Sequence, residues 1–229
     1  MSSRDGEAYG NTFARWREAA GEDWGAYTRH AFVAGLADGS LPRAAFLKYL
    51  VQDYIFLFHF SRAWALAAVK ADHPGEMKTA AATLDALVNH EMPMHIRTCA
   101  AEGIDEATLF AAREEPETLA YTRYVMDAGF SGDFLDLMAA LAPCVIGYGE
   151  IGARLADEAT SDTYRPWIDT YAAPEYQSVC ADVGALIDDA LHHRLGKDAA
   201  STPRADALAR RFATATRLEA DFWSMGLRT

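Results

Sequence analysis

LMAALAPCVIGYGEIGARLAD, residues 137–157, is a mostly apolar run of helical character with a single cysteine, Cys144. Counted in helical steps, Tyr148 follows at i+4 and Ile151 at i+7, so the thiol, the phenol and an aliphatic group are predicted to share one face. The glycines of the run are Gly147, Gly149 and Gly152. Each costs a helix about 1 kcal/mol relative to alanine, so we expect a ligand or a neighbouring helix to press closely on this segment. A lone cysteine is most often a core residue, and its role has to be judged from the rest of the chain.

The composition is that of an ordinary globular protein. The 229 residues are 51% hydrophobic and 24% charged, which fits one large domain over residues 1–229. The net charge of -12 argues against a nucleic-acid partner, because such partners are bound mainly through Lys and Arg at phosphates. The sequence also has no basic run that would bind an anionic membrane.

The sequence predicts a cytoplasmic protein. The first residues, MSSRDGEAYGNTFARW, lack the apolar core of a signal peptide, and no run of about 18 consecutive apolar residues occurs. The cysteines Cys99, Cys144 and Cys180 are odd in number and form no CxxC pair. This usage fits a reducing compartment and gives no support to a zinc site.

Hydrophobic periodicity, glycines and prolines predict an all-α chain, and we find no strand alternation of useful length. The long apolar helix from Pro42 to Val69 is predicted to be the central one. The helix from Gly75 to Ala101 should kink at Pro93. The other predicted helices are Ala8–Ala20, Trp24–Leu36, Glu106–Arg113, Glu117–Ala128, Leu137–Asp157, Ser161–Tyr171, Pro174–Leu195 and Arg204–Met225, with Gly129 and Gly132 in a turn and Gly196–Pro203 as a loop.

Asp53 is the unusual member of the central helix. Tyr49, Asp53, Phe56 and Phe60 fall at i, i+4, i+7 and i+11 and form one stripe of an otherwise apolar helix. A buried carboxylate without a partner would cost several kcal/mol, so Asp53 must be hydrogen-bonded or must coordinate something. An Arg or a backbone donor elsewhere in the bundle would be the purely structural partner.

Glu219 is a second acid among aromatic residues. Phe222 and Trp223 follow it at i+3 and i+4 in the sequence RLEADFWSM. Taken alone it fits a partly solvated acid near the chain end. Tyr121 and Tyr171, taken singly, fit core or interface aromatic residues.

Several motifs together resemble the TenA-type thiaminase II family. They are GSLPRAAFLKYLVQDYIFL, YTRYV, APCVIGYGEIG, WIDTY and EADFW, in the order and spacing of that family. The resemblance runs from about Trp24 to the last of these motifs. It implies a heme-oxygenase-like helical bundle and a homotetramer.

The resemblance also implies roles for individual residues. Those that match the family's three acting residues are Asp53, Cys144 and Glu219. Those that match positions lining its pyrimidine pocket are Phe56, Tyr121, Tyr148 and Tyr171. Many members have Tyr where this chain has Phe56, so one hydroxyl is missing. The glycine-rich APCVIGYGEIG segment departs from a commoner aromatic version, and a larger pocket is expected from it.

The implied activity is hydrolysis of 4-amino-5-(aminomethyl)pyrimidine and/or thiamin, which gives 4-amino-5-hydroxymethyl-2-methylpyrimidine for thiamin salvage. Aromatic side chains can stack on this flat ring, and Asp53 can accept its N–H groups. The Cys144 thiolate would add to the ring, and Glu219 would protonate the departing amine and then activate water. We expect no cofactor and no metal.

Two other functions are compatible with the sequence. A carboxylate-bridged di-metal oxidase of the same fold class would draw on Glu91, His95, Glu150, Asp189, His192 and His193. Asp189 and His192 have the one-turn spacing of paired ligands, but a pair of Glu-x-x-His motifs is missing, and a solvated Asp/His face near a helix C-terminus explains them better. A non-catalytic pyrimidine-binding or regulatory protein would keep the fold without turnover.

Overall fold

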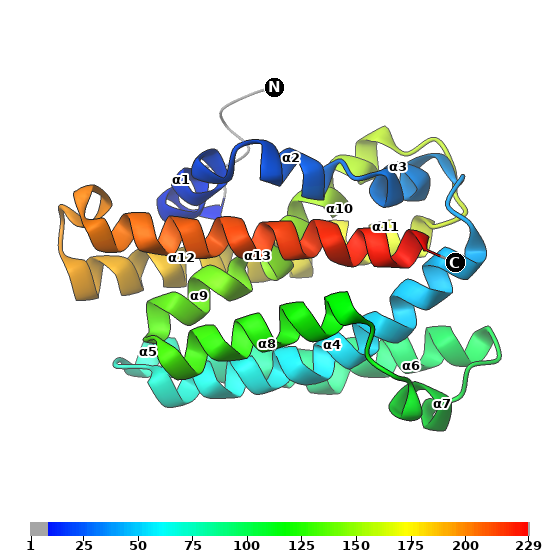
Figure 1. Cartoon of the computed structure of the whole chain (residues 1–229), viewed down its shortest axis with the longest axis horizontal. Coiled ribbons are helices and arrows are strands. Elements are labelled where there is room, and N and C mark those ends of the chain that lie inside the picture. The colour runs from blue at the N-terminus through cyan, green and yellow to red at the C-terminus, as the bar shows by residue number, and fades with distance from the viewer. Residues whose placement is uncertain (1–8, 229) are drawn as a thin grey trace. The chain divides into compact units, whose positions relative to one another are not determined.

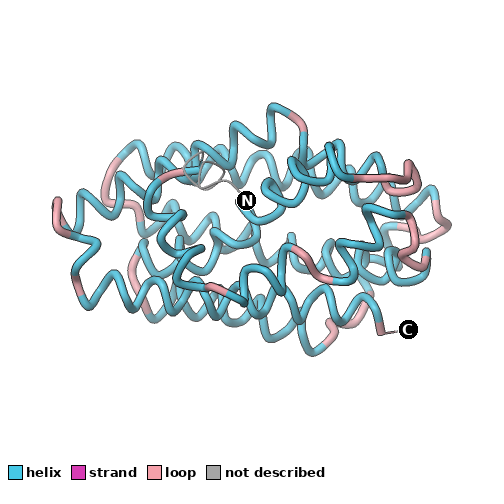
Figure 2. Tube along the Cα trace, turned by 90° about the horizontal axis from the view of Figure 1, so that it is seen from above, coloured by secondary structure: helices cyan, strands magenta, loops and turns pink. Residues whose placement is uncertain are grey.

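The computed structural model describes residues 9–228, which form helices joined by short loops (Figure 1; Figure 2). This part of the chain contains no strand. The predicted all-α class is therefore confirmed.

The helices group into two compact units that are not continuous in sequence. Unit 1 comprises Met1–Leu41 and Met138–Ala220, and unit 2 comprises Pro42–Leu137 and Asp221–Thr229. Two helices, α9 (Phe134–Ala142) and α13 (Pro203–Leu227), contribute residues to both units. A single domain over residues 1–229 stays a prediction.

Unit 1 packs around an aromatic core. Its other elements are α1 (Asn11–Ala20), α2 (Glu22–Thr28), α3 (Ala31–Asp38), η3 (Pro143–Gly147), α10 (Tyr148–Glu158), α11 (Arg165–Ala172), α12 (Pro174–Leu195) and η4 (Ala199–Ser201). The Phe212 ring lies 5.9 Å from the Phe13 ring and 5.6 Å from the Trp24 ring. Full burial of each such side chain stabilises the fold by about 2 kcal/mol.

The first helices differ from prediction in one respect. A single helix over Trp24–Leu36 is predicted, but α2 ends at Thr28 and α3 begins at Ala31, so this prediction is wrong. The His30 side chain accepts a hydrogen bond from the Phe32 N–H (3.2 Å). It thereby satisfies one of the donors that the start of a helix leaves without a partner. Ala8, predicted to begin the first helix, lies outside the described residues.

Unit 2 is organised around α4 (Arg43–Lys70), which begins directly after Pro42 as predicted. Its other elements are α5 (Pro74–Ala86), η2 (Leu87–Glu91), α6 (Met92–Ala101), α7 (Glu106–Ala111) and α8 (Pro116–Ser131). α4 contacts α5, α6, α7 and α8. Gly129, predicted at the turn, lies inside α8. A Cβ at this position would meet the Leu66 side chain of α4 at 2.5 Å. The two helices therefore pack too closely at this point for a larger residue.

Two helical runs contain a π turn, in which backbone hydrogen bonds reach five residues instead of four. η2 precedes α6, whose second residue is Pro93, so the predicted helix Gly75–Ala101 departs from α-helical geometry just before this proline, and the predicted kink stays a prediction. η3 begins at Pro143 and interrupts the run predicted as one helix over Leu137–Asp157. Proline has no N–H for the carbonyl four residues earlier, which is why helices kink or widen beside it.

The run Phe134–Glu158 is long and apolar enough to cross a membrane by length and composition alone. However, 89% of its most apolar window is buried inside the protein. A helical run buried in a protein core passes the same test, and this run is buried in that way.

Candidate active site

Asp53 is buried in unit 2 and is held by two side chains. Its Oδ2 atom accepts hydrogen bonds from the Tyr49 hydroxyl (3.1 Å) and from His95 Nε2 (2.7 Å). Tyr49 lies one turn earlier on α4, as the predicted stripe requires, whereas His95 comes from α6. Both hydrogen bonds of Asp53 to described residues end on Oδ2, so Oδ1 can accept from a ligand.

His95 is charged by its surroundings. Its Nδ1 lies 3.2 Å from the Glu91 carbonyl, which can only accept, so Nδ1 carries a proton. Nε2 faces the Asp53 carboxylate, and an ionised carboxylate also needs a donor there. Burial acts to lower the pKa of His95, but the hydrogen bond and charge of Asp53, together with Glu91, raise it above its ordinary value. An imidazolium–carboxylate pair results.

Sequence reasoning considered His95 only for the rival metal centre and missed it as a partner of Asp53. The available signal was Asp53 itself, since a carboxylate on a buried helix needs donors from elsewhere. Neither an Arg nor a backbone donor plays that part. A histidine 42 positions along the chain does so.

An aromatic wall adjoins Asp53 on α4. The Phe56 ring lies 4.9 Å from the Tyr121 ring and 5.8 Å from the Phe222 ring. All three side chains are buried. Because Phe56 has no hydroxyl, it can offer a flat ligand a stacking surface but no hydrogen bond.

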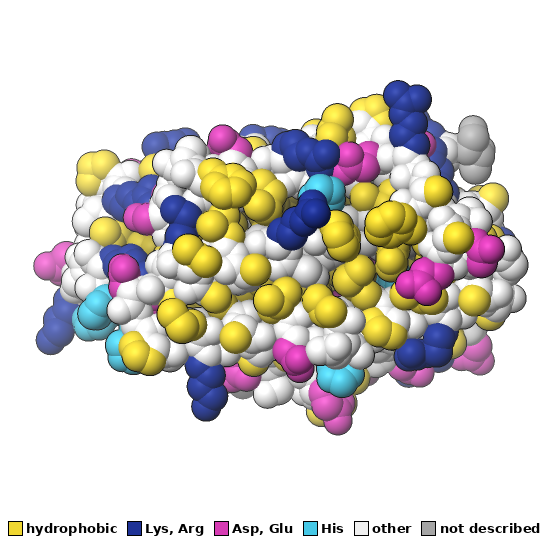
Figure 3. Space-filling view, turned by 90° about the horizontal axis from the view of Figure 1, so that it is seen from below, with side chains coloured by type: hydrophobic (Ala, Val, Ile, Leu, Met, Phe, Trp, Pro, Cys, Tyr) yellow, Lys and Arg dark blue, Asp and Glu magenta, His cyan; other side chains and the backbone are white. Residues whose placement is uncertain are grey.

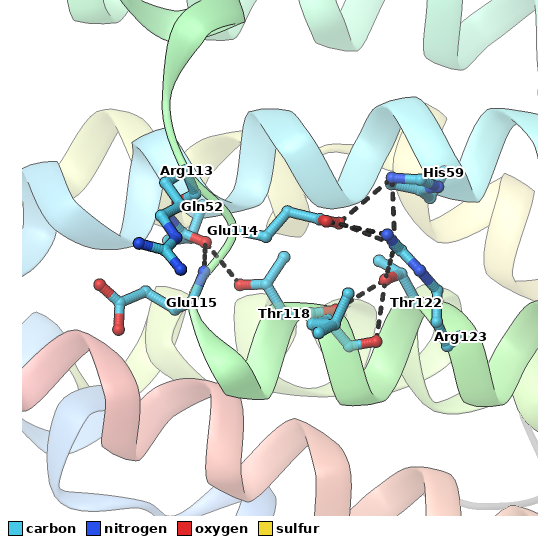
Figure 4. Close-up of polar contacts among 9 residues, drawn as sticks. Gln52, His59, Arg113, Glu114, Glu115, Thr118, Thr122 and Arg123 are labelled. Carbon is cyan, nitrogen blue, oxygen red and sulfur yellow. Dashed lines mark hydrogen bonds and ion pairs between the residues drawn. The ribbon is translucent and has the colours of Figure 1, made fainter.

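Gln52 of α4 fastens the start of α8, the helix that carries Tyr121 (Figure 4). Its side-chain oxygen accepts from the Glu115 N–H (3.0 Å) and the Thr118 hydroxyl (2.7 Å). Its amide nitrogen donates to the Arg113 carbonyl (3.0 Å). These bonds fix the position of α8 on α4 and hence that of Tyr121 against Phe56.

A second polar group joins the same helices nearer the surface (Figure 4). Arg123 donates to both carboxylate oxygens of Glu114, at 2.7 and 2.8 Å, and lowers the pKa of that carboxyl. Burial lowers the pKa of His59, so its neutral Nε2 can accept from Arg123 (3.3 Å). Partly exposed pairs of this kind contribute at most about 1 kcal/mol, so we assign the group a structural role.

Cys144 lies in the π turn η3 of unit 1 and differs from the other two cysteines. It is partly exposed, whereas Cys99 and Cys180 are buried. Burial raises the pKa of the Cys99 thiol to about 11 and that of Cys180 to about 12. Since the thiolate is the reactive form, Cys99 and Cys180 are inert near neutral pH.

The predicted aromatic residues of unit 1 come together beside this segment. The Tyr148 and Tyr171 rings are 5.0 Å apart, and Trp167 lies 4.6 Å from Tyr171. The extra residue of the π turn changes the register from Cys144 to Ile151, so the predicted 3.6-residue face does not hold strictly across the turn. Tyr148 begins α10, directly after the turn.

The space beside each glycine of this run is occupied by a neighbouring part of unit 1. A Cβ at Gly147 would lie 2.4 Å from the Tyr27 ring, and one at Gly149 would lie 2.5 Å from Cys180 Sγ. At Gly152 it would lie 2.5 Å from the Tyr171 backbone. The expectation of close neighbours is confirmed, and the expectation that these glycines enlarge a pocket stays a prediction.

Glu219 of α13 belongs to unit 1 and is 1% exposed. The partly solvated acid of the structural interpretation is therefore excluded. Among the predicted site residues, unit 1 contains Cys144, Tyr148, Tyr171 and Glu219, and unit 2 contains Asp53, Phe56 and Tyr121.

Two of the side chains suggested for a di-metal centre have other partners, and three are exposed. Glu150 accepts from Arg17 (2.7 Å) and from the Trp24 indole N–H (3.0 Å), while His95 pairs with Asp53. Asp189, His192 and His193 are exposed on α12. Within residues 9–228 no three His, Cys, Asp or Glu side chains are grouped as metal ligands.

Comparison with known proteins connects this geometry to a family. A model of the TENA/THI-4/PQQC family matches residues 17–229. An aminopyrimidine aminohydrolase of Halalkalibacterium halodurans is 34% identical over 91% of this chain and 92% of its own. A structure from Silicibacter sp. TM1040, named a TenA family transcription regulator, is 58% identical, with a TM-score of 0.96 over 97% of this chain and 99% of that chain.

The fold itself is shared more widely. A structure from Shewanella denitrificans with a heme oxygenase-like fold has a TM-score of 0.65 at 16% identity, over 91% of this chain and 88% of that chain. The predicted heme-oxygenase-like fold is confirmed.

Proposed function

The chain belongs to the TENA/THI-4/PQQC family, and on this premise we propose that it is an aminopyrimidine aminohydrolase of thiamin salvage. Its substrate is 4-amino-5-(aminomethyl)-2-methylpyrimidine and/or thiamin. Its product is 4-amino-5-hydroxymethyl-2-methylpyrimidine. The Halalkalibacterium halodurans relative bears the name of this activity.

The contrast between the three cysteines carries the proposal. Cys144 is partly exposed in a π turn, and such turns are frequent at functional sites. The two buried thiols have pKa values raised to about 11 and about 12. Cys144 is thus the thiol that this chain can offer as a nucleophile.

Asp53 binds the pyrimidine in this proposal. His95 and Tyr49 hold its Oδ2 atom, which leaves Oδ1 to accept an N–H of the amino-pyrimidine edge. A charged donor or acceptor forms the stronger hydrogen bond, so the contact of Asp53 with His95 holds this side chain firmly in place. Phe56 and Tyr121 supply flat surfaces against which an aromatic ring can stack.

Covalent catalysis then proceeds in balanced steps. The Cys144 thiolate forms a C–S bond to a ring carbon, and the ring electrons expel the amine from the methylene carbon as Glu219 gives it a proton. Water adds to the exocyclic methylene and loses a proton to the Glu219 carboxylate. The C–S bond breaks, the thiolate is regenerated, and the ring becomes aromatic again. The sum is aminopyrimidine plus water giving alcohol plus ammonia.

An ammonia-release assay tests this function. Purified protein should release ammonia from 4-amino-5-(aminomethyl)-2-methylpyrimidine, and the same preparation is assayed with thiamin to rank the two substrates. Cys144→Ser should abolish ammonia release from the aminopyrimidine and release of the thiazole from thiamin. If the protein turned over neither of the two compounds, the proposal would be overturned.

A second candidate is a non-catalytic regulator that binds a pyrimidine. It is favoured by the name of the 58% identical Silicibacter structure, a transcription regulator. The net charge of -12 speaks against direct binding to DNA. Tight binding of the hydroxymethylpyrimidine without any ammonia release would favour this function.

The proposed assembly is a homotetramer in the cytoplasm. Figure 3 shows hydrophobic side chains spread over one face between scattered charges. Exposed large hydrophobic residues of unit 2 include Val69, Met77, Phe110 and Phe130. Exposed side chains of this kind are available for contacts between subunits. Light scattering should give four times the chain mass of 25.1 kDa, and a monomer mass would contradict the tetramer.

A further inference from the structure

The carbonyl groups on either side of Cys144 accept hydrogen bonds from two phenols of unit 1. Tyr27 of α2 donates its hydroxyl to the Pro143 carbonyl, and Tyr176 of α12 donates to the Val145 carbonyl, both at 3.2 Å. These carbonyls belong to the residues directly before and after Cys144. The π turn is therefore held from two separate helices.

Two more donors of α12 act on the same helical run. Cys180 Sγ donates to the Val145 carbonyl (3.5 Å). The Gln177 amide nitrogen donates to the carbonyls of Gly149 (3.0 Å) and Tyr171 (2.8 Å). Gln177 thus joins α10 to α11, and α11 carries Tyr171, which is predicted to line the substrate pocket.

The local sequence is shaped for these contacts. Pro143 has no N–H for the carbonyl four residues earlier, so a regular α-turn cannot be completed there. Gly147 lacks a Cβ, and one placed there would lie 2.4 Å from the Tyr27 ring. Most of the turn is buried, so water cannot replace the phenols as donors.

We propose that Tyr27 and Tyr176 are positioning residues for Cys144. Their hydroxyls hold the π turn open, and the turn sets the position of the thiol relative to the carbon that it attacks. The inference rests on the proposed function, in which Cys144 is the nucleophile. A displacement of about 1 Å can cost a reaction about 100-fold, so small relaxations of this turn matter.

The test compares three matched variants. Tyr27→Phe and Tyr176→Phe each remove one hydroxyl bound to η3. Tyr164→Phe is the control, because the Tyr164 hydroxyl donates to the Leu41 carbonyl (2.6 Å), away from the turn and in the same unit. For each protein we would measure Tm, the rate of Cys144 alkylation by iodoacetamide, kcat and KM.

Tyr27→Phe and Tyr176→Phe should slow Cys144 alkylation and lower kcat by about fivefold or more, the factor expected for one hydrogen bond, with KM nearly unchanged. Tyr164→Phe should lower Tm by a similar amount without slowing Cys144 alkylation or lowering kcat. Equal Tm losses in all three variants, with wild-type alkylation of Cys144, would show a merely structural role and overturn the inference. If one variant fails to fold, the other decides, since each acts on a different carbonyl.

Alkylation needs no turnover, so the two proposals fail separately. If Tyr27→Phe and Tyr176→Phe both slowed alkylation but the wild type hydrolysed no aminopyrimidine, only the proposed function would be overturned. Normal hydrolysis with unchanged alkylation would overturn the positioning role alone.

Discussion

The two π turns within residues 9–228, η2 and η3, both lie beside a proline but have different surroundings. Each lies at a proline, Pro93 just after η2 and Pro143 at the start of η3. Three of the five residues of η2 are exposed, so water can reach its backbone. Four of the five residues of η3 are buried, and its carbonyls are satisfied by phenol and thiol donors. A widened turn in the interior thus requires dedicated partners.

The turns also differ in what they orient. The Glu91 carbonyl, in the last residue of η2, accepts from His95, which supports the Asp53 carboxylate. η3 carries Cys144 itself. One turn therefore acts through a charge pair and the other through the placement of a nucleophile, and substitutions should affect them differently.

The largest effect is expected at Cys144 of η3. Cys144→Ser keeps the shape but offers a hydroxyl that is scarcely ionised near neutral pH, so turnover should fall by about 10³-fold or more while pyrimidine binding persists. Steady-state kinetics would measure turnover, and calorimetric titration would measure pyrimidine binding.

Two companion variants separate the roles. Asp53→Asn should weaken binding as well, because only one of its two terminal atoms accepts, so the NH2 group would face either the ligand or the donors Tyr49 and His95. Glu219→Gln should lower turnover with the smallest effect on binding. Near-normal hydrolysis by Cys144→Ser, with Glu219→Gln inactive, would replace covalent catalysis by direct attack of water.

The next effect concerns the charge pair beside η2. His95→Gln should destabilise the fold by about 3 kcal/mol near pH 6, because it leaves the buried Asp53 charge without its cation. The folded-state pKa of His95 is raised, so the pair's contribution is complete below the ordinary value of about 6.5 and is lost as the pH rises through the folded value. The difference in unfolding free energy between the wild type and His95→Gln, measured by urea unfolding, should therefore shrink above pH 6.5.

His59→Gln is the matched control. His59 lies in a partly exposed group and its pKa is lowered, so its replacement should cost less than about 1 kcal/mol. A deficit for His95→Gln that stays constant from pH 6 to pH 9 would contradict the charged pair.

A smaller effect tests the close packing of η3. Gly147→Ala places a Cβ 2.4 Å from the Tyr27 ring, and overpacking of this kind costs about 1–3 kcal/mol. Gly25→Ala in α2 meets nothing within 4 Å and should be neutral or stabilising by up to about 1 kcal/mol. Equal unfolding free energies for the two variants would mean that Tyr27 moves aside without cost.

The sequence predicts well what depends on local periodicity. The length of α4 and the one-turn spacing of Tyr49 and Asp53 follow from the 3.6-residue repeat, and both are confirmed. The break between α2 and α3 escapes prediction because it depends on a cap by His30, a residue type that rarely signals a helix start.

Contacts between distant segments are beyond such reasoning. His95 reaches Asp53 from another helix, and Tyr27 fills the space at Gly147 from more than 100 residues away. Pro143 did carry a readable signal, because a proline inside an apolar run predicts a local departure from the α-helix. The family resemblance named the acting residues, but not the side chains that hold them.

Selective alkylation of the three cysteines tests most directly whether Cys144 is the nucleophile. Iodoacetamide at pH 7.5, followed by peptide mass spectrometry, would be run with and without 4-amino-5-hydroxymethyl-2-methylpyrimidine. With the pKa of Cys99 raised to about 11 and that of Cys180 to about 12, Cys144 should react first, and the pyrimidine should protect it. Equal labelling of all three thiols, unaffected by the pyrimidine, would contradict the account.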